Sequence, residues 1–100
     1  MTDEKVDVIC DSRLGKYFKI TKEALDIAKK ADKRKGMEKE AADFLDMASR
    51  YYSDAEHFKS KGNYVLAYGA LNYAHGWLDA GARIQLFKVK DSRLFTVDDE

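Results

Sequence analysis

Apolar residues recur at every third or fourth position along three stretches of this chain. In the first stretch, from Ser12 to Asp32, the repeat is carried by Leu14, Tyr17, Phe18, Thr21, Ala24, Leu25, Ala28 and Ala31. This spacing places the side chains on one face of an α-helix. We therefore predict a helix over about residues 12–33, with Ser12 as its N-cap and Gly36 as the residue that stops it.

The second stretch, from Met37 to Lys61, predicts a helix over about residues 37–61. Its apolar face holds Met37, Ala41, Phe44, Leu45, Ala48, Tyr51, Tyr52, Ala55 and Phe58. Gly62 follows, where the end of a helix needs a residue in the left-handed conformation, and Asn63 can cap a third helix over about residues 63–86. Because only about two residues connect them, the second and third helices are expected to be antiparallel neighbours.

The third predicted helix is apolar around most of its circumference. One face holds Tyr64, Ala67, Tyr68, Leu71, Ala74, Leu78 and Ala82, and another holds Leu66, Ala70, Tyr73, Trp77, Ala80 and Ile84. The narrow stripe that remains holds Gly69, Asn72, His75, Gly76, Asp79 and Arg83. A helix of this kind either lies centrally against both other helices or offers its surplus apolar surface to a partner chain.

Residues 88–100 alternate only weakly between apolar and polar. A short hairpin is one interpretation, but two strands of about four residues are marginal on their own. We instead predict an irregular tail that Phe95 anchors against the helices, with frayed ends over residues 98–100 and 1–5. With no proline and six glycines in 100 residues, the chain is predicted to be one all-α domain, a three-helix bundle with its core over about residues 12–90.

The charged residues balance, because 18 Lys and Arg stand against 18 Asp and Glu. The chain therefore lacks the field that nucleic-acid binders and anionic-membrane binders carry, and we expect neither as a partner. The basic run within residues 29–39 is diluted by acidic residues and has no aromatic platform for base stacking, which is typical of a solvated loop. The most apolar stretch, residues 64–86, contains Asn72, Asp79 and Arg83, which favours a buried helix over a membrane span.

The sequence has few groups that suit a disulfide or a metal. Its single cysteine, Cys10, excludes an intramolecular disulfide, and with only two histidines a structural zinc site lacks ligands. The carboxylates lack the Glu-x-x-His spacing of a di-iron bundle. The polar start, Met1–Asp7, has no apolar signal segment. We expect a cytoplasmic protein without a cofactor, in which Cys10 is a small, partly buried apolar residue.

One cluster of side chains can carry chemistry. His75, Asp79 and Arg83 follow one another at intervals of four residues, so they point the same way from the third predicted helix. In an antiparallel pair of the second and third helices, residues whose numbers sum to about 125 lie opposite each other. This register places Arg50 and Tyr51 beside His75. The candidate ligand or interaction cluster is therefore Arg50, Tyr51, His75, Asp79 and Arg83.

Two interpretations of this cluster are open. A histidine with carboxylates and a guanidinium can bind a ligand that bears phosphate or carboxylate, or supply acid–base catalysis. Alternatively, the same side chains form a network between helices, with His75 paired to Asp79 and Arg83 paired to Asp43. We favour the network and assign no catalytic residue.

A second motif points to a different class of protein. Six residues separate Arg50 from His57, a pattern that resembles the arginine-then-histidine motif of HEPN-type helical ribonucleases. In that motif a polar residue usually follows the arginine, whereas Tyr51 does so here. The two side chains lie within about 20° of each other around a helix, as they do in many unrelated helices. A HEPN-like nucleotide-binding protein or ribonuclease, using this pair or the His75 cluster, is the alternative function.

The stretch ASRYYSDAEHFKSKGNYVLAYGALNYAHGWLDAGAR, residues 48–83, resembles the archaeal domain-of-unknown-function family 357. Its last part, YAHGWLDAGAR, is the most distinctive, and the likeness covers about residues 12–90. The resemblance implies a small all-helical archaeal protein that folds as a bundle. It transfers no catalytic residue, because the family has no assigned activity, and it implies an accessory module beside nucleotidyltransferase-like domains.

A weaker resemblance is to a single tetratricopeptide hairpin, carried by Tyr51, Ala55, Phe58, Gly62, Tyr64, Ala67, Leu71 and Ala74. The pattern does not repeat, so a third helix must cover the hairpin. Aromatic residues concentrate near this hairpin, where they fill the core or form a partner surface: Tyr51, Tyr52, Tyr64, Tyr68, Tyr73 and Trp77. The leading functional prediction is a non-enzymatic interaction or accessory module that binds a protein partner or forms a homodimer through the third helix.

Overall fold

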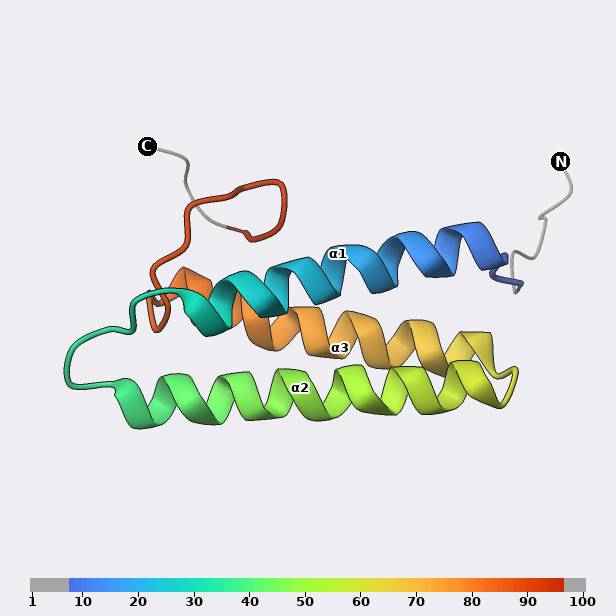
Figure 1. Ribbon diagram of the computed structural model, residues 1–100, viewed down its shortest axis with the longest axis horizontal. Helices are drawn as coiled ribbons and strands as arrows, with labels where there is room; N and C mark the ends of the chain where they lie inside the picture. Colours follow the sequence, from blue (N-terminus) through green and yellow to red (C-terminus); the bar gives the residue numbers. More distant parts are fainter. Residues whose placement is uncertain (1–7, 97–100) are drawn as a thin grey trace, which may run out of the picture.

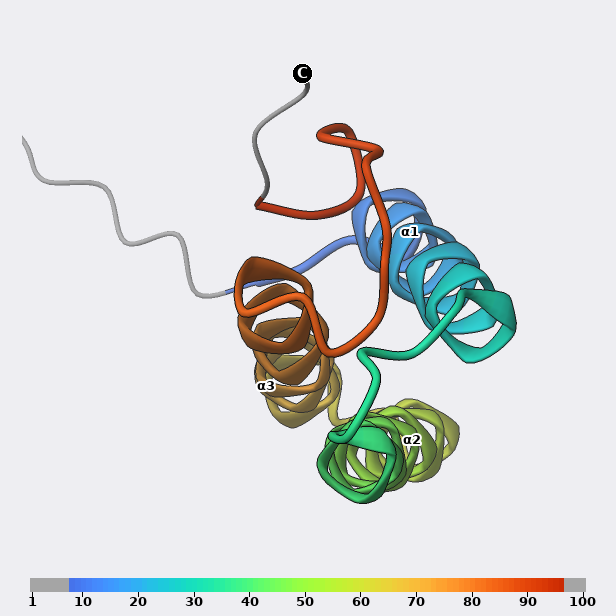
Figure 2. The same ribbon diagram turned by 90° about the vertical axis from the view of Figure 1, so that its left-hand side faces the viewer.

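The computed structural model describes residues 8–96. Three helices follow one another: α1 (Asp11–Lys30), α2 (Glu38–Ser60) and α3 (Tyr64–Arg83), with α2 running opposite to the other two (Figure 1). Seen from one end, the helices occupy the corners of a triangle (Figure 2). The predicted all-α three-helix bundle is confirmed. The frayed ends predicted for residues 1–5 and 98–100 lie outside the described residues.

Two groups of buried side chains form the core. The larger lies toward the α1–α2 loop and contains Ala24, Leu25, Ala28, Ala41, Leu45, Ala48, Leu78, Ala82, Leu86, Phe87, Leu94 and Phe95. The smaller lies toward the α2–α3 turn and contains Leu14, Ala55, Ala67 and Leu71. Many of the buried residues are alanines, which allow the helices to approach closely. None of the helices within residues 8–96 is long and apolar enough to cross a membrane.

The α2–α3 turn forms as its sequence predicts. Gly62 adopts a positive φ of 76°, and the backbone N–H of Asn63 donates to the carbonyl of Phe58 at 2.9 Å. Together these features form the Schellman motif that ends many helices. The Asn63 side chain then accepts a hydrogen bond from the backbone of Leu66 at 3.3 Å and caps α3.

The start of α1 differs from the prediction. The N-cap residue is Cys10, and no side-chain hydrogen bond caps the helix, so the prediction of Ser12 as the cap is wrong. Ser12 lies inside the first turn, where its Oγ is 3.4 Å from the Sγ of Cys10. Cys10 is exposed, so the prediction of a partly buried cysteine is also wrong.

The end of α1 lies three residues before its predicted position. The Nζ of Lys33 turns back and donates to the carbonyls of Ala28 and Lys29, each at 3.0 Å, and also to that of Ala31. These bonds satisfy carbonyls that the end of a helix leaves without partners. This arrangement places Lys33 beyond the end of the helix, where its backbone forms an isolated antiparallel bridge with Phe87.

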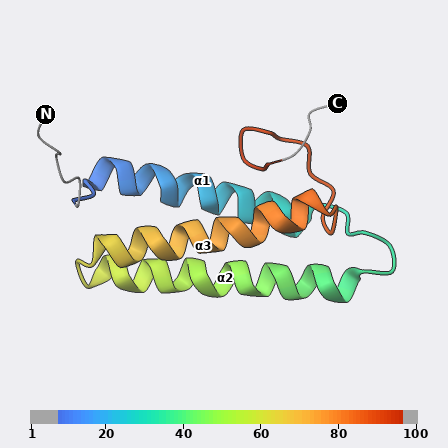
Figure 3. The same ribbon diagram turned by 180° about the vertical axis from the view of Figure 1, so that it is seen from behind.

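The C-terminal strap, which we define as residues 87–96, follows α3 and turns back over α1 and α3 (Figure 3). α3 ends at Arg83, three residues before its predicted end, and Gln85, with φ 60°, then reverses the chain. Leu94 and Phe95 are buried against the helices. The irregular tail with Phe95 as an anchor is thus confirmed.

Candidate functional site

His75 fastens the C-terminal strap to the helices. Its Nε2 lies 2.6 Å from the carbonyl oxygen of Leu94, and its Nδ1 lies 3.2 Å from the hydroxyl of Thr21 on α1. Because a carbonyl can only accept, Nε2 carries the proton. In the neutral ring Nδ1 is then an acceptor, and the Thr21 hydroxyl donates to it. Both ring nitrogens are therefore occupied by hydrogen bonds within the chain.

Asp79 holds the next part of the strap. Its Oδ1 accepts a hydrogen bond from the backbone N–H of Thr96 at 2.9 Å. The same oxygen lies 3.8 Å from Nε2 of His75, beyond normal hydrogen-bond length. The predicted proximity of His75 and Asp79 is therefore present, although each of them makes its shorter contact with the strap.

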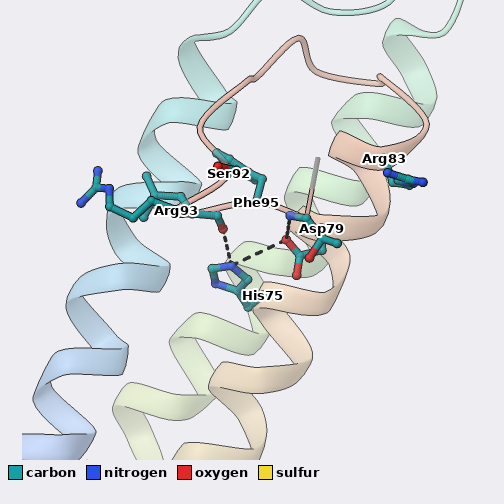
Figure 4. A pocket seen from close by; sticks show the side chains of 8 residues that line it. His75, Asp79, Arg83, Ser92, Arg93 and Phe95 are labelled. Carbon is teal, nitrogen blue, oxygen red and sulfur yellow. Dashed lines mark hydrogen bonds and ion pairs between the residues drawn. The ribbon is translucent and has the colours of Figure 1, made fainter. Parts of the chain in front are cut away.

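A cavity of about 420 Å³ opens between α3 and the strap, and it is lined by His75, Asp79, Arg83 and residues 92–96 (Figure 4). The side chain of Arg93 points toward α1, where its Nη2 donates to Oε1 of Glu23 at 2.9 Å. The same nitrogen donates to Oδ2 of Asp91, within the strap, at 3.2 Å. These hydrogen bonds raise the pKa of the Arg93 guanidinium, so it stays charged. Figure 4 shows Arg83 pointing in the opposite direction. The two guanidiniums therefore do not converge on one anion.

The structure does not bring Arg50 and Tyr51 to this cavity. Tyr51 lies opposite Tyr73, with ring centroids 4.3 Å apart, so the predicted register holds along the helices. His75, however, is two residues further on, about 200° around α3, and faces α1. Arg50 remains on the exposed surface of α2, where its Nε pairs with Asp46 at 2.9 Å.

Arg50 and His57 lie apart on the surface of α2. Both side chains are exposed on α2, and seven positions of helix separate them by about 10 Å along the axis. The ring of His57 lies 5.8 Å from that of Phe58. Within residues 8–96, no group of three or more His, Cys, Asp or Glu residues is placed to hold a metal ion.

Sequence reasoning missed three contributors to the His75 cluster: Thr21, Leu94 and Thr96. Thr21 carried a signal, because it is a polar residue on the apolar face of α1, and in the structure it is buried. Leu94 and Thr96 contribute only backbone atoms to the cluster. Backbone contacts of an irregular segment leave no trace in residue type.

Together, the fold and the site define an all-helical protein in which a histidine on α3 fastens a C-terminal strap. The chain belongs to the DUF357 family: the family model described as "Protein of unknown function (DUF357)" matches residues 16–87. The predicted family resemblance is therefore confirmed. Comparisons with curated proteins and with solved structures give no match.

Proposed function

We propose that this chain is a non-enzymatic interaction module that binds another protein through one face of α3. We define the α3 outer face by its exposed residues and the exposed residue that follows the helix: Val65, Leu66, Gly69, Asn72, Tyr73, Gly76, Ala80, Arg83 and Ile84. Four of these residues are large and apolar, and a patch of such residues on a soluble protein marks a site of interaction.

The exposure of these four side chains is the observation that carries the proposal. Val65 is 58% exposed, Leu66 49%, Tyr73 51% and Ile84 47%. α3 already packs against both α1 and α2, so this is the surplus apolar surface that its sequence predicts. By contrast, the exposed positions of α2 are polar or charged except for Ala42. The apolar face is thus a property of α3 and not of the helices in general.

The His75 cluster supports a non-enzymatic role. A general acid or base needs a ring nitrogen within reach of a substrate, and both nitrogens of His75 are held by Thr21 and Leu94. The HEPN-like alternative needs Arg50 and His57 to act together, and Arg50 pairs with Asp46 instead. A module that provides a binding surface fits both observations. The proposal extends to an accessory role beside another protein.

Site-specific photocrosslinking tests this proposal. A benzophenone amino acid at position 66 on the α3 outer face is expected to form a covalent adduct with a protein in the native cells. The same amino acid at position 53 on the exposed face of α2 is the matched control and is expected to form none. An absence of adducts at position 66, or equal adducts at both positions, overturns the proposal.

A further inference from the structure

We propose that the protein bound by the α3 outer face is a second copy of this chain. The two α3 helices pair antiparallel about a two-fold axis that passes near Tyr73 and Gly76. This inference rests on the proposed function and names its partner. It is carried by the size and polarity of the residues along the face.

The α3 outer face has a groove between two ridges. At 100° per residue, the small residues Gly69, Gly76 and Ala80 fall on one line along the middle. One ridge beside this line is apolar and consists of Leu66, Tyr73 and Ile84. The other ridge is mixed and consists of Val65, Asn72 and Arg83. The face therefore has an apolar side and a polar side.

This asymmetry selects the antiparallel arrangement. An antiparallel two-fold axis places each ridge beside the same ridge of the partner, so apolar residues meet apolar residues. A parallel two-fold axis instead places Tyr73 near the partner's Asn72 and Ile84 near the partner's Arg83. The antiparallel pair also aligns the helix dipoles favourably.

The residue sizes are complementary in one register. When residues whose numbers sum to about 149 lie opposite each other, Tyr73 faces the partner's Gly76 and Gly69 faces the partner's Ala80. The large exposed ring of Tyr73 thus enters the groove where the partner has no side chain. In the same register the apolar Leu66 and Ile84 come together at each end. The axis lies close to the middle of α3, so the pairing uses the whole helix.

Within residues 8–96, nothing packs against Gly69 or Gly76 at the position that a side chain would take. A Cβ atom at Gly69 or Gly76 would meet no atom of the described chain within 4 Å. A glycine inside a helix destabilises it relative to alanine. Close approach of a second helix is the use that these positions fit, because small residues let helix backbones come together.

The face has the size of a weak, reversible contact between two copies. α3 has 20 residues, which corresponds to a length of about 30 Å. A contact of that length and about 10 Å width covers about 300 Å² of each copy, or about 600 Å² of the two together, which is the size of a weak and reversible association. Arg83 is the one charged residue of the face and lies at its end, where an interface is polar.

Sedimentation equilibrium of the intact chain tests the pairing. Between about 10 µM and about 1 mM, the mass of the wild-type protein is expected to rise with concentration from 11.4 kDa toward twice that value. Gly76→Glu places a charge in the groove at the two-fold axis and is expected to weaken association at least about 100-fold. Gly15→Glu on α1 is the matched control, since a Cβ atom at Gly15 also meets no atom of the described chain within 4 Å, and this variant is expected to associate as wild type.

Circular dichroism checks that both variants remain helical, which is the expected result. A wild-type mass of 11.4 kDa at all concentrations overturns the dimer, as does equal weakening by both glutamates. Disulfide crosslinking in a Cys10→Ser background tests the orientation. A mixture of Leu66→Cys and Ile84→Cys chains is expected to crosslink, whereas each variant alone is not. Crosslinking of each variant alone indicates a parallel pair and overturns the antiparallel arrangement.

The photocrosslinking experiment separates this inference from the proposed function. A monomeric chain that still forms an adduct with a different protein at position 66 overturns the second copy as partner but supports the interaction module. A monomeric chain without any adduct overturns both. An adduct of twice the chain mass supports both.

Discussion

Single atoms decide how closely the C-terminal strap can approach α3. A Cβ atom at Gly81 would lie 2.2 Å from Cζ of Phe87, which is far inside van der Waals contact. The ring of Phe87 is fully buried there and cannot move without opening the core. The contact therefore depends on glycine at this position, although its sequence pattern is that of an ordinary helix residue.

Gly81→Ala is expected to destabilise the fold by about 1–3 kcal/mol, because the added methyl group overpacks the core against Phe87. Gly15→Ala is the control, since its Cβ meets no atom of the described chain within 4 Å. That change is expected to stabilise α1 by about 0.5–1 kcal/mol. Urea unfolding measures both, and equal effects of the two variants contradict the account of Gly81.

The thiol of Cys10 is affected by a single neighbouring hydroxyl group. The hydrogen bond from the Ser12 side chain lowers the pKa of the Cys10 thiol, because it stabilises the thiolate. The thiolate fraction, and with it the alkylation rate, is therefore expected to rise at lower pH than for an ordinary cysteine. Ser12→Ala is expected to shift the rate profile of iodoacetamide alkylation to higher pH. An unchanged profile shows that Ser12 does not act on the thiol.

At the scale of helices, the ends show what the sequence could reveal. Both α2 and α3 end in a Schellman motif, the second through a 2.8 Å hydrogen bond from Leu86 to the carbonyl of Gly81. The first motif uses Gly62, which is visible in the sequence, and the prediction of that turn is accurate. The second uses Gln85, a residue with no preference for a positive φ, and the predicted end is three residues late.

The candidate site was also predictable only in part. The interval of four residues correctly placed His75, Asp79 and Arg83 beside one cavity. The register of the hairpin gave the height of each residue along α3 but not its direction around the helix. For that reason Arg50 was expected beside His75, whereas Thr21 of α1 occupies that place.

The strap is expected to loosen when its histidine is removed. His75→Ala deletes the donor to the Leu94 carbonyl, so the amides of Leu94 and Phe95 are expected to exchange hydrogen faster. Thr21→Val keeps that bond and is expected to leave their exchange rates near wild type. Hydrogen exchange followed by NMR measures both variants. Faster exchange in both of them, or in neither, contradicts the role of the Leu94 bond.

The large apolar side chains exposed on the helices of the described molecule are concentrated on one face. The net charge is zero, while the large exposed apolar residues of the helices lie on one side of α3. Association through that side is expected to depend little on ionic attraction. Raising the salt from about 0.1 M to about 1 M shortens the Debye length from about 10 Å to about 3 Å.

Over this salt range, the dimer dissociation constant from sedimentation is expected to stay constant or fall, because apolar contacts are not screened. An interface held by pairs of opposite charges instead weakens under the same conditions. A dissociation constant that rises with salt therefore indicates that charged residues outside the α3 outer face hold the copies together.

The C-terminal strap also bears on where a gene fragment for this protein can stop. The family match ends at residue 87, yet Leu94 and Phe95 beyond it are each only 2% exposed. A fragment cut at residue 87 removes two buried side chains and leaves the ring of His75 without its carbonyl acceptor. It also exposes the apolar side chains of α1 and α3 that Leu94 and Phe95 cover. Such a fragment is expected to precipitate on expression, whereas one that extends past Thr96 keeps both buried side chains and is expected to stay in solution.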